Sequence, residues 1–72
     1  MKVKYDRETD IILIEVSKEK VDHAEEMGNI IVHFTKENKP VLLEILDSSD
    51  FLPELTKAVI KSEPNRTVEL AV

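Results

Sequence analysis

The alternation of apolar and polar residues predicts two β-strands that fold back on each other near the middle of the chain. In residues 29–35 and again in residues 41–47, apolar side chains recur at every second position. A turn at Glu37-Asn38, or a loop over residues 36–39, joins the two segments. A slip of one residue would place apolar side chains opposite polar ones on every rung, so the pairing is constrained. The predicted opposite pairs are Phe34 with Val41, Val32 with Leu43, and Ile30 with Ile45.

Three earlier segments also have strand character. Residues 2–6 alternate, and the lysines on their polar face are typical of an edge strand. Residues 11–16 are apolar on both faces, which predicts a central strand. Residues 21–27 fit either a strand or a single helical turn closed by Gly28. We favour the strand, because seven residues make a marginal helix.

One helix is predicted after the central hairpin. Residues 48–50 offer three N-cap candidates, and Pro53 favours Ser49 or Asp50, because a proline is harmless only in the first turn. Leu55 is expected to be buried where this helix meets the sheet. The predicted helix ends at Lys61 or Ser62 and carries one apolar stripe of Phe51, Leu52, Leu55, Ala58 and Val59.

Together these elements predict an α+β fold, in which a small antiparallel β-sheet packs on one α-helix. The sheet is expected to be a meander of about four strands, with a possible further edge strand at the C-terminus. Residues 1–62 form the predicted single domain and residues 63–72 a tail. The tail alternates over residues 67–72 like a strand. It could pair within its own sheet or reach across to a partner's sheet.

Composition narrows the class of protein. The chain has 72 residues, no cysteine and a formal net charge of −5. A chain of this length buries only about 60% of its unfolded surface, and small domains without disulfides often oligomerise. Residues 21–56 carry eight acids against two lysines, which argues against nucleic-acid binding. The absence of a long apolar run predicts a cytoplasmic protein that does not enter a membrane, and abundant Glu and Lys without Gln fit a heat-adapted source.

The residues that could carry chemistry are few. His23 and His33 are the only histidines, and no metal-ligand spacing joins them. His33 is expected on a sheet face opposite Leu42. Glu44 lies among apolar residues and could pair with His33 or Lys4 across the sheet, or act as a functional acid. A structural role for Glu44 is the favoured interpretation.

The remaining acids have structural explanations. The calcium-loop pattern is absent. Asp6 and Asp10 are interpreted as turn formers, and Asp47 and Asp50 as acids at the start of the helix. We therefore predict no catalytic residues, no bound metal and no cofactor.

A partner surface is predicted on the face away from the helix, because one helix cannot cover both faces of the sheet. The predicted function is accordingly a protein-interaction module that forms a homodimer through this face and could bind a small protein partner. The alternative is a small enzyme or a ligand- or metal-binding protein that uses Glu44 with His33 or His23. The candidate interface residues are Ile11, Leu13, Ile31, His33, Leu42 and Leu46.

Two short motifs resemble a known family. Tyr5-Asp6-x-Glu8-x-Asp10, then Gly28 before an apolar strand, and then residues 44–49 (EILDSS) are similar to the short proteins catalogued as domain of unknown function 2283. The resemblance implies a small β-sheet with a C-terminal helix and supplies no catalytic residues. It also implies a genomic setting beside small toxin-like genes, and hence an antitoxin-like or accessory role.

The chain departs from the family pattern at three positions. Asn38 stands where a turn glycine is usual, and Asn tolerates positive φ. Ser48 replaces a usual alanine. Leu42 replaces a usual glycine and adds apolar bulk to the predicted interface, which strengthens the prediction of a partner there.

Overall fold

A computed structural model describes residues 1–62 and 67–71 of the chain. Within these residues the chain forms one antiparallel sheet and two short helices, which confirms the predicted α+β class. None of the described helices is both long and apolar enough to cross a membrane. The elements in chain order are β1 (Lys2–Asp6), β2 (Ile11–Glu15), β3 (His23–Met27), β4 (Ile30–Phe34), β5 (Pro40–Ile45), α1 (Ser48–Phe51), α2 (Pro53–Ser62) and β6 (Thr67–Ala71).

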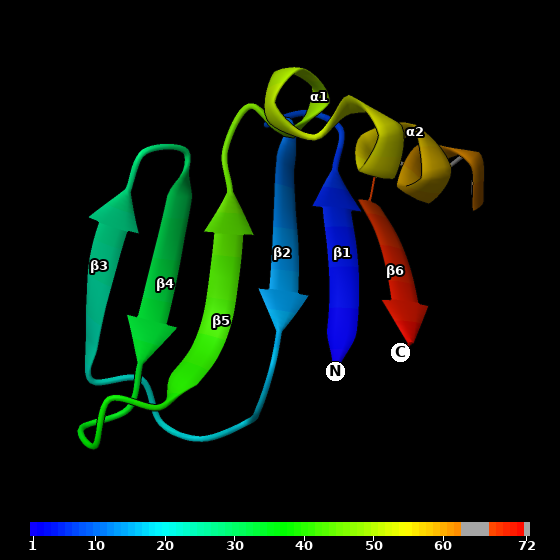
Figure 1. Cartoon of the computed structure of the whole chain (residues 1–72). Coiled ribbons are helices and arrows are strands. Elements are labelled where there is room, and N and C mark those ends of the chain that lie inside the picture. Colours follow the sequence, from blue (N-terminus) through cyan, green and yellow to red (C-terminus); the bar gives the residue numbers. More distant parts are fainter. Residues whose placement is uncertain (63–66, 72) are drawn as a thin grey trace.

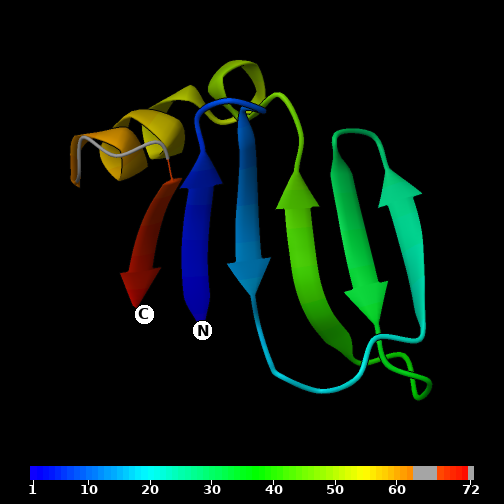
Figure 2. The same cartoon turned by 180° about the vertical axis from the view of Figure 1, so that it is seen from behind.

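The order of strands across the sheet is β3-β4-β5-β2-β1-β6 (Figures 1 and 2). Residues 2–45 thus supply five strands instead of the expected four, because residues 23–27 are extended as favoured. The sheet is also not a simple meander. The β1–β2 hairpin joins the β3–β4–β5 meander through pairing of β2 with β5, and β2 is central as predicted.

The strand in the C-terminal tail, β6, determines whether β1 lies at the edge of the sheet. β6 pairs with β1 of its own chain, so β1 lies between two neighbours. The prediction that β1 is an edge strand is therefore wrong. Pairing of β6 within its own sheet is one of the two possibilities that the sequence left open, and the strand at the other edge is β3.

The central hairpin keeps most of its predicted register. Ile30 lies opposite Ile45, and Val32 lies opposite Leu43. His33 lies opposite Leu42, also as expected. The last predicted pair is wrong: Phe34 lies opposite Pro40, because the register shifts between His33 and Phe34. Val41 is the extra residue of this bulge, and its carbonyl accepts hydrogen bonds from the backbone N–H groups of Val16 and Ser17 at 2.8 and 3.2 Å.

Left-handed backbone conformations close the turns. Asp10 (φ 57°) ends the β1–β2 turn, Gly28 (φ 59°) lies between β3 and β4, and Asn38 (φ 65°) lies between β4 and β5. Aspartate, asparagine and glycine are the residues that adopt this region most readily. Asn38 therefore replaces the family's usual glycine without loss of the turn.

The helical segment begins earlier than predicted and is interrupted. Asp47, with φ 49°, is the N-cap of α1, so the expectation of Ser49 or Asp50 at this position is wrong. The helix then breaks at Leu52, whose φ of −132° is not helical, and Pro53 opens α2. The break follows from chemistry, because a residue before proline is disfavoured in the α conformation. One predicted helix is thus two.

The core lies between the helices and one face of the sheet. Tyr5, Ile12 and Ile45 are buried, and Leu52 and Ile60 from the helical segment pack against them. We call this side of the sheet the helix-side face and the other side the opposite face. Leu55 is 41% exposed, so the prediction that it is buried at the junction is wrong. Figures 1 and 2 show that the helices lie over one end of the sheet rather than across its middle.

Candidate functional site

Glu44 meets His33 on the opposite face. The two residues lie on neighbouring strands, and Nε2 of His33 is 2.7 Å from Oε2 of Glu44. Both side chains are about one quarter exposed, at 24% and 27%. Ile31 and Leu13 flank Glu44 directly across the strands. The predicted pairing of Glu44 with His33 is therefore present.

His23 takes no part in this pair. It lies opposite Phe34, one position out of phase with His33, so the two histidines lie on different faces. Its ring stacks on Phe34 at a centroid distance of 5.4 Å, and its Nδ1 lies 2.9 Å from Asp22. The alternative that Glu44 acts with His23 is not compatible with this arrangement.

The His33–Glu44 pair can hold or move one proton, but it offers few ligands. A zinc site needs three or four protein ligands. Among the described residues, no group of three or more His, Cys, Asp or Glu side chains could hold a metal ion. The pair by itself therefore fits a cross-strand hydrogen bond between partly exposed side chains.

A denser polar cluster surrounds Asp10. Its carboxylate accepts hydrogen bonds from the Tyr5 hydroxyl at 2.8 Å, the Ser48 hydroxyl at 3.2 Å and the Ser49 hydroxyl at 2.6 Å. The Ser49 backbone N–H adds a longer contact at 3.3 Å. The Asp10 carbonyl also accepts from the Ser48 backbone N–H at 3.0 Å. The cluster ties the β1–β2 turn to the first turn of α1.

Burial and hydrogen bonding act in opposite directions on the Asp10 carboxyl. Burial alone would raise its pKa, but the hydrogen bonds from Ser49, Tyr5 and Ser48 outweigh burial, and the pKa lies below its ordinary value. For Tyr5, burial and the bond to Asp10 both raise the pKa of the phenol. Asp10 is thus charged and Tyr5 neutral near pH 7, which suits a donor–acceptor pair.

This cluster explains the family motifs better than a catalytic role does. Tyr5 and Asp10 come from the first motif and Ser49 from the second, whereas Ser48 stands where the resemblance gives alanine as usual. The sequence predicts Asp10 only as a turn former, and its contacts with the two serines were not predicted. Because 38 positions separate Asp10 from Ser48, no local pattern in the sequence joins them. Their shared task is to fix the start of the helical segment on the sheet.

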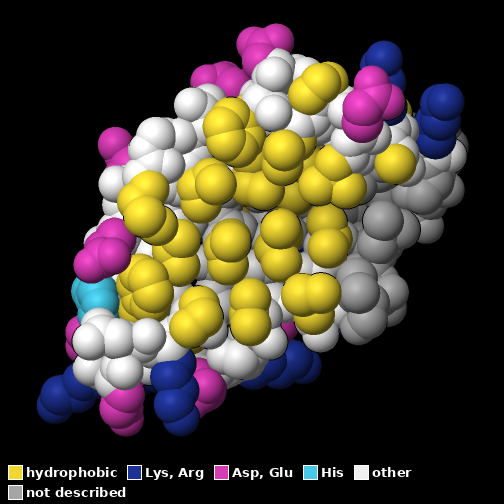
Figure 3. Space-filling view, in the orientation of Figure 1, with side chains coloured by type: hydrophobic (Ala, Val, Ile, Leu, Met, Phe, Trp, Pro, Cys, Tyr) yellow, Lys and Arg dark blue, Asp and Glu magenta, His cyan; other side chains and the backbone are white. Residues whose placement is uncertain are grey.

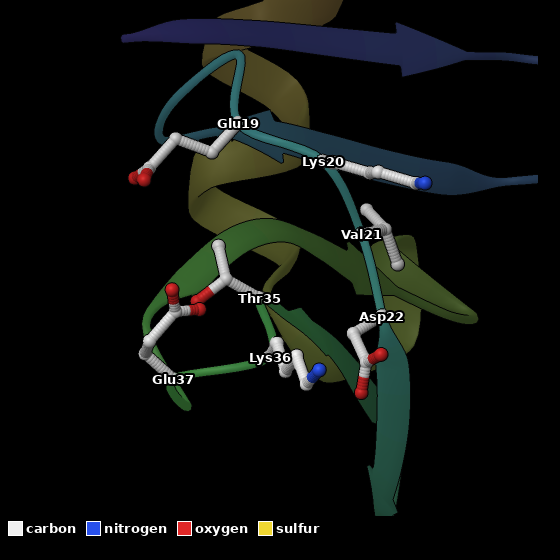
Figure 4. A pocket seen from close by; sticks show the side chains of 7 residues that line it. All are labelled: Glu19, Lys20, Val21, Asp22, Thr35, Lys36 and Glu37. Carbon is white, nitrogen blue, oxygen red and sulfur yellow. The ribbon is translucent and has the colours of Figure 1, made fainter.

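A pocket of about 500 Å³ lies between the β2–β3 loop and the β4–β5 turn (Figure 4). Its lining is Glu19, Lys20, Val21, Asp22, Thr35, Lys36 and Glu37. Glu19 and Lys20 extend in opposite directions in Figure 4 rather than toward a common point. Binding sites for small molecules have convergent polar groups on a mostly apolar lining. This pocket has a largely charged lining, so it does not resemble a binding site for a small molecule.

The predicted interface residues lie together on the opposite face. Leu13, Ile31 and Leu42 are half-buried there, Ile11 begins β2, and Leu46 directly follows β5. Polar and charged residues interrupt them on each rung. The rung through Leu13 runs Lys4, Leu13, Glu44, Ile31 and Glu26, and the next runs Lys2, Glu15, Leu42, His33 and Ala24.

The helix-side face is more uniformly apolar. Figure 3 views the molecule from this side and shows apolar side chains that run without interruption from the sheet onto the helices, with charged groups at the margin. Sequence reasoning expected the helix to cover this face and did not predict an exposed surface here. We call the half-buried members of this region the open surface: Val3, Ile14, Ile30, Phe34 and Leu43.

Comparison with known proteins places the chain in a family without assigning an activity. No curated protein and no solved structure matches it. A family model described as "Protein of unknown function (DUF2283)" matches residues 2–49, which include both short motifs and all of β1 to β5. The match spans two thirds of the 72 residues, and the chain belongs to this family of proteins of unknown function.

Proposed function

We propose that this protein is a small protein-interaction module that self-associates through an exposed apolar face of its sheet. The observation that carries the proposal is the continuous apolar region in Figure 3. Large exposed apolar patches on small proteins usually mark a surface that another chain covers.

The size of the exposed region sets the expected affinity. If the two subunits together bury about 500 Å² of apolar area, the gross gain is on the order of 12 kcal/mol at about 25 cal/mol per Å². Association costs roughly 4 kcal/mol or more. The net is at best about −8 kcal/mol, which corresponds to a dissociation constant near 1 μM. The homodimer should therefore form and dissociate over an accessible concentration range.

A second partner follows from the family setting. The resemblance implies a position beside small toxin-like genes, so we propose a small toxin-like protein as the other chain that this module binds. In that role the protein would be an antitoxin-like or accessory partner. The acidic charge of −5 would favour a basic partner over another acidic one.

Sedimentation velocity of the intact protein from about 1 to 100 μM tests self-association. The proposal expects a shift from monomer to dimer across this range. Purification from the source cell tests the second partner and expects a stoichiometric small protein. A sharp monomer at the highest concentration, together with the absence of a co-purifying protein, would contradict the proposed function.

The alternative function rests on one observation, the 2.7 Å contact between His33 and Glu44. A small enzyme or ligand-binding protein would use this pair on the opposite face. Calorimetric titration with zinc or calcium tests it directly. Micromolar binding that is abolished by Glu44→Gln would favour this alternative over the interaction module.

A further inference from the structure

The helical layer leaves much of the helix-side face uncovered. α2 packs mainly on β1 and β6, and α1 sits at the end of the strands beside the β1–β2 turn. Leu52 and Ile60 reach the cluster of Tyr5, Ile12 and Ile45. The next rung, which runs through Leu43 and Ile14, lies farther from that end of the sheet.

The uncovered region carries almost no charge. On β1, β2, β4 and β5, the helix-side positions within the ladders are all apolar: Val3, Tyr5, Ile12, Ile14, Ile30, Val32, Phe34, Leu43 and Ile45. Polar groups on this face come from the edge strand β3, which contributes His23 and Glu25. The opposite face instead carries charged and polar residues between its apolar ones: Glu15, Glu26, Glu44, Lys2, Lys4 and His33.

This difference decides which face suits self-association. Burying charged side chains in an interface costs free energy unless each is well paired with an opposite charge. A homodimer through the opposite face would bury the charged side chains of both copies, whereas the helix-side face brings together uncharged centres. Leu42 is on the opposite face, so its replacement of the family's glycine no longer argues for the homodimer contact.

The small core indicates which chain covers the open surface. Among residues whose side chains the structure describes, the buried apolar set is Tyr5, Ile12, Val32, Val41 and Ile45. Stable domains are built from at least two packed layers, and here the second layer covers only one end of the sheet. A second copy of the same chain is the one partner present whenever this chain folds. We infer that two copies pack their helix-side faces together and that the open surface is the centre of a two-fold homodimer interface.

This inference rests on the proposed function and adds to it the face, the partner and the symmetry. A two-fold contact uses the same patch on both copies. Leu43 and Ile14 face each other across the two middle strands β5 and β2, so they should lie close to the axis. Phe51 and Leu55, 46% and 41% exposed on the helical segment, would extend the contact.

Adjacent leucines on β5 provide a matched test. Leu42 and Leu43 are both half-buried and point to opposite faces of the same strand. In sedimentation velocity at about 100 μM, Leu43→Lys should be monomeric and Leu42→Lys should remain a dimer like the intact protein. Circular dichroism at the same concentration shows whether each variant is folded.

A second pair covers the case in which Leu43→Lys does not fold. Met27 is 56% exposed and lies on the helix-side face of β3, whereas the exposed Ala24 lies on the opposite face of the same strand. A lysine at either position should leave the chain folded. Met27→Lys should weaken the dimer about tenfold or more, by about 1.4 kcal/mol, and Ala24→Lys should leave it unchanged.

The outcomes separate this inference from the proposed function. If the intact protein is a dimer that Leu42→Lys dissociates and Leu43→Lys does not, the interface is on the opposite face and the inference is wrong. It is also wrong if both leucine variants remain dimers, or if Met27→Lys dimerises as tightly as Ala24→Lys. In each of these cases self-association stands. A monomeric intact protein overturns the inference, and the proposed function then depends on the co-purifying partner alone.

Discussion

Replacing Asp10 with asparagine tests whether the cluster around its carboxylate holds the helical segment on the sheet. Asparagine has nearly the same shape and also tolerates the backbone of Asp10, whose φ is 57°. The substitution removes the negative charge and replaces one acceptor oxygen with an amide donor. The bond between the Asp10 carbonyl and the Ser48 backbone is kept, so the change isolates the side chain.

The expected loss can be worked from the contacts. Tyr5, Ser48 and Ser49 each donate a hydroxyl to the carboxylate, at 2.8, 3.2 and 2.6 Å. A hydrogen bond to a charged group contributes roughly 1.5–3 kcal/mol and a neutral one about 0.5–1.5 kcal/mol. Loss of the charge therefore costs about 1 kcal/mol per bond, or about 2–3 kcal/mol in all. That is a large part of the roughly 5 kcal/mol that stabilises a small domain.

Asp47 provides the control. It also has a left-handed backbone, with φ 49°, but it is exposed and makes no side-chain capping hydrogen bond. Asp47→Asn should change the free energy of unfolding by less than about 0.5 kcal/mol, as surface substitutions usually do. Urea unfolding at pH 7, at a fixed protein concentration, measures both variants. Equal losses for the two variants would show that the Asp10 cluster contributes nothing specific.

The pH dependence gives an independent check. The pKa of Asp10 is lowered in the folded protein relative to its ordinary value of 3.8. Its contribution to stability is therefore fully present above that value and is lost as the pH falls through the lower, folded-state pKa. The unfolding free energy of Asp10→Asn should fall less steeply with acidification below about pH 4 than that of the intact protein. Parallel curves for the two proteins would refute the reasoning.

Four further predictions follow from the structure. Gly28→Ala should cost about 1–2 kcal/mol in urea unfolding because Gly28 has φ 59°, with open space for the new methyl group; a neutral result would mean that the turn relaxes. Leu55→Ala should cost less than about 1 kcal/mol because the side chain is 41% exposed, and a loss above about 2 kcal/mol would restore the buried position that the sequence suggested. Glu44→Gln should change stability by less than about 1 kcal/mol, as expected for a partly exposed pair, and a larger loss would point to a more deeply coupled site. NMR cross-strand contacts should join Phe34 to Pro40, and contacts to Val41 in their place would exclude the bulge.

The periodicity of the sequence predicted the parts of the fold that depend on local alternation. Ile30 opposite Ile45 and Val32 opposite Leu43 follow from matching apolar faces within one hairpin. The predicted pairing of Phe34 with Val41 failed because matching the apolar faces assumes an uninterrupted ladder. The carbonyl of Val41 accepts hydrogen bonds from Val16 and Ser17 at the end of β2, and this pairing with a distant segment is absent from the hairpin's own pattern.

Strand order was unpredictable for a related reason. Alternation shows which side chains share a face, but it does not show which neighbour a strand selects. A meander was the simplest arrangement, since consecutive strands usually pair. Here β2 pairs with β5 across the intervening β3–β4 hairpin. The tail, which pairs with β1, adds a second contact between distant segments.

The Asp10 cluster shows the same division between local and long-range information. The local interpretation of Asp10 as a turn former is correct, because its backbone N–H donates to the Asp6 carbonyl at 2.8 Å. Its carboxylate accepts hydrogen bonds from Ser48 and Ser49, which lie beside it because β5 pairs with β2. The local sequence therefore predicts the turn conformation of the Asp10 backbone but not the hydrogen bonds of its side chain.

The exposed apolar face could be predicted from the sequence by comparing the size of the helix with the size of the sheet, in addition to the alternation of apolar residues. Four strands about 4.8 Å apart and five residues long present a face of roughly 19 by 17 Å. α2 has ten residues, so it is about 15 Å long and about 10 Å wide. One such helix covers roughly half of that face. The expectation that the helix shields one side, and leaves only the other for a partner, was therefore inconsistent with the size of the helix. Because the uncovered half is apolar on each of these strands, it is the surface that the proposed homodimer would bury.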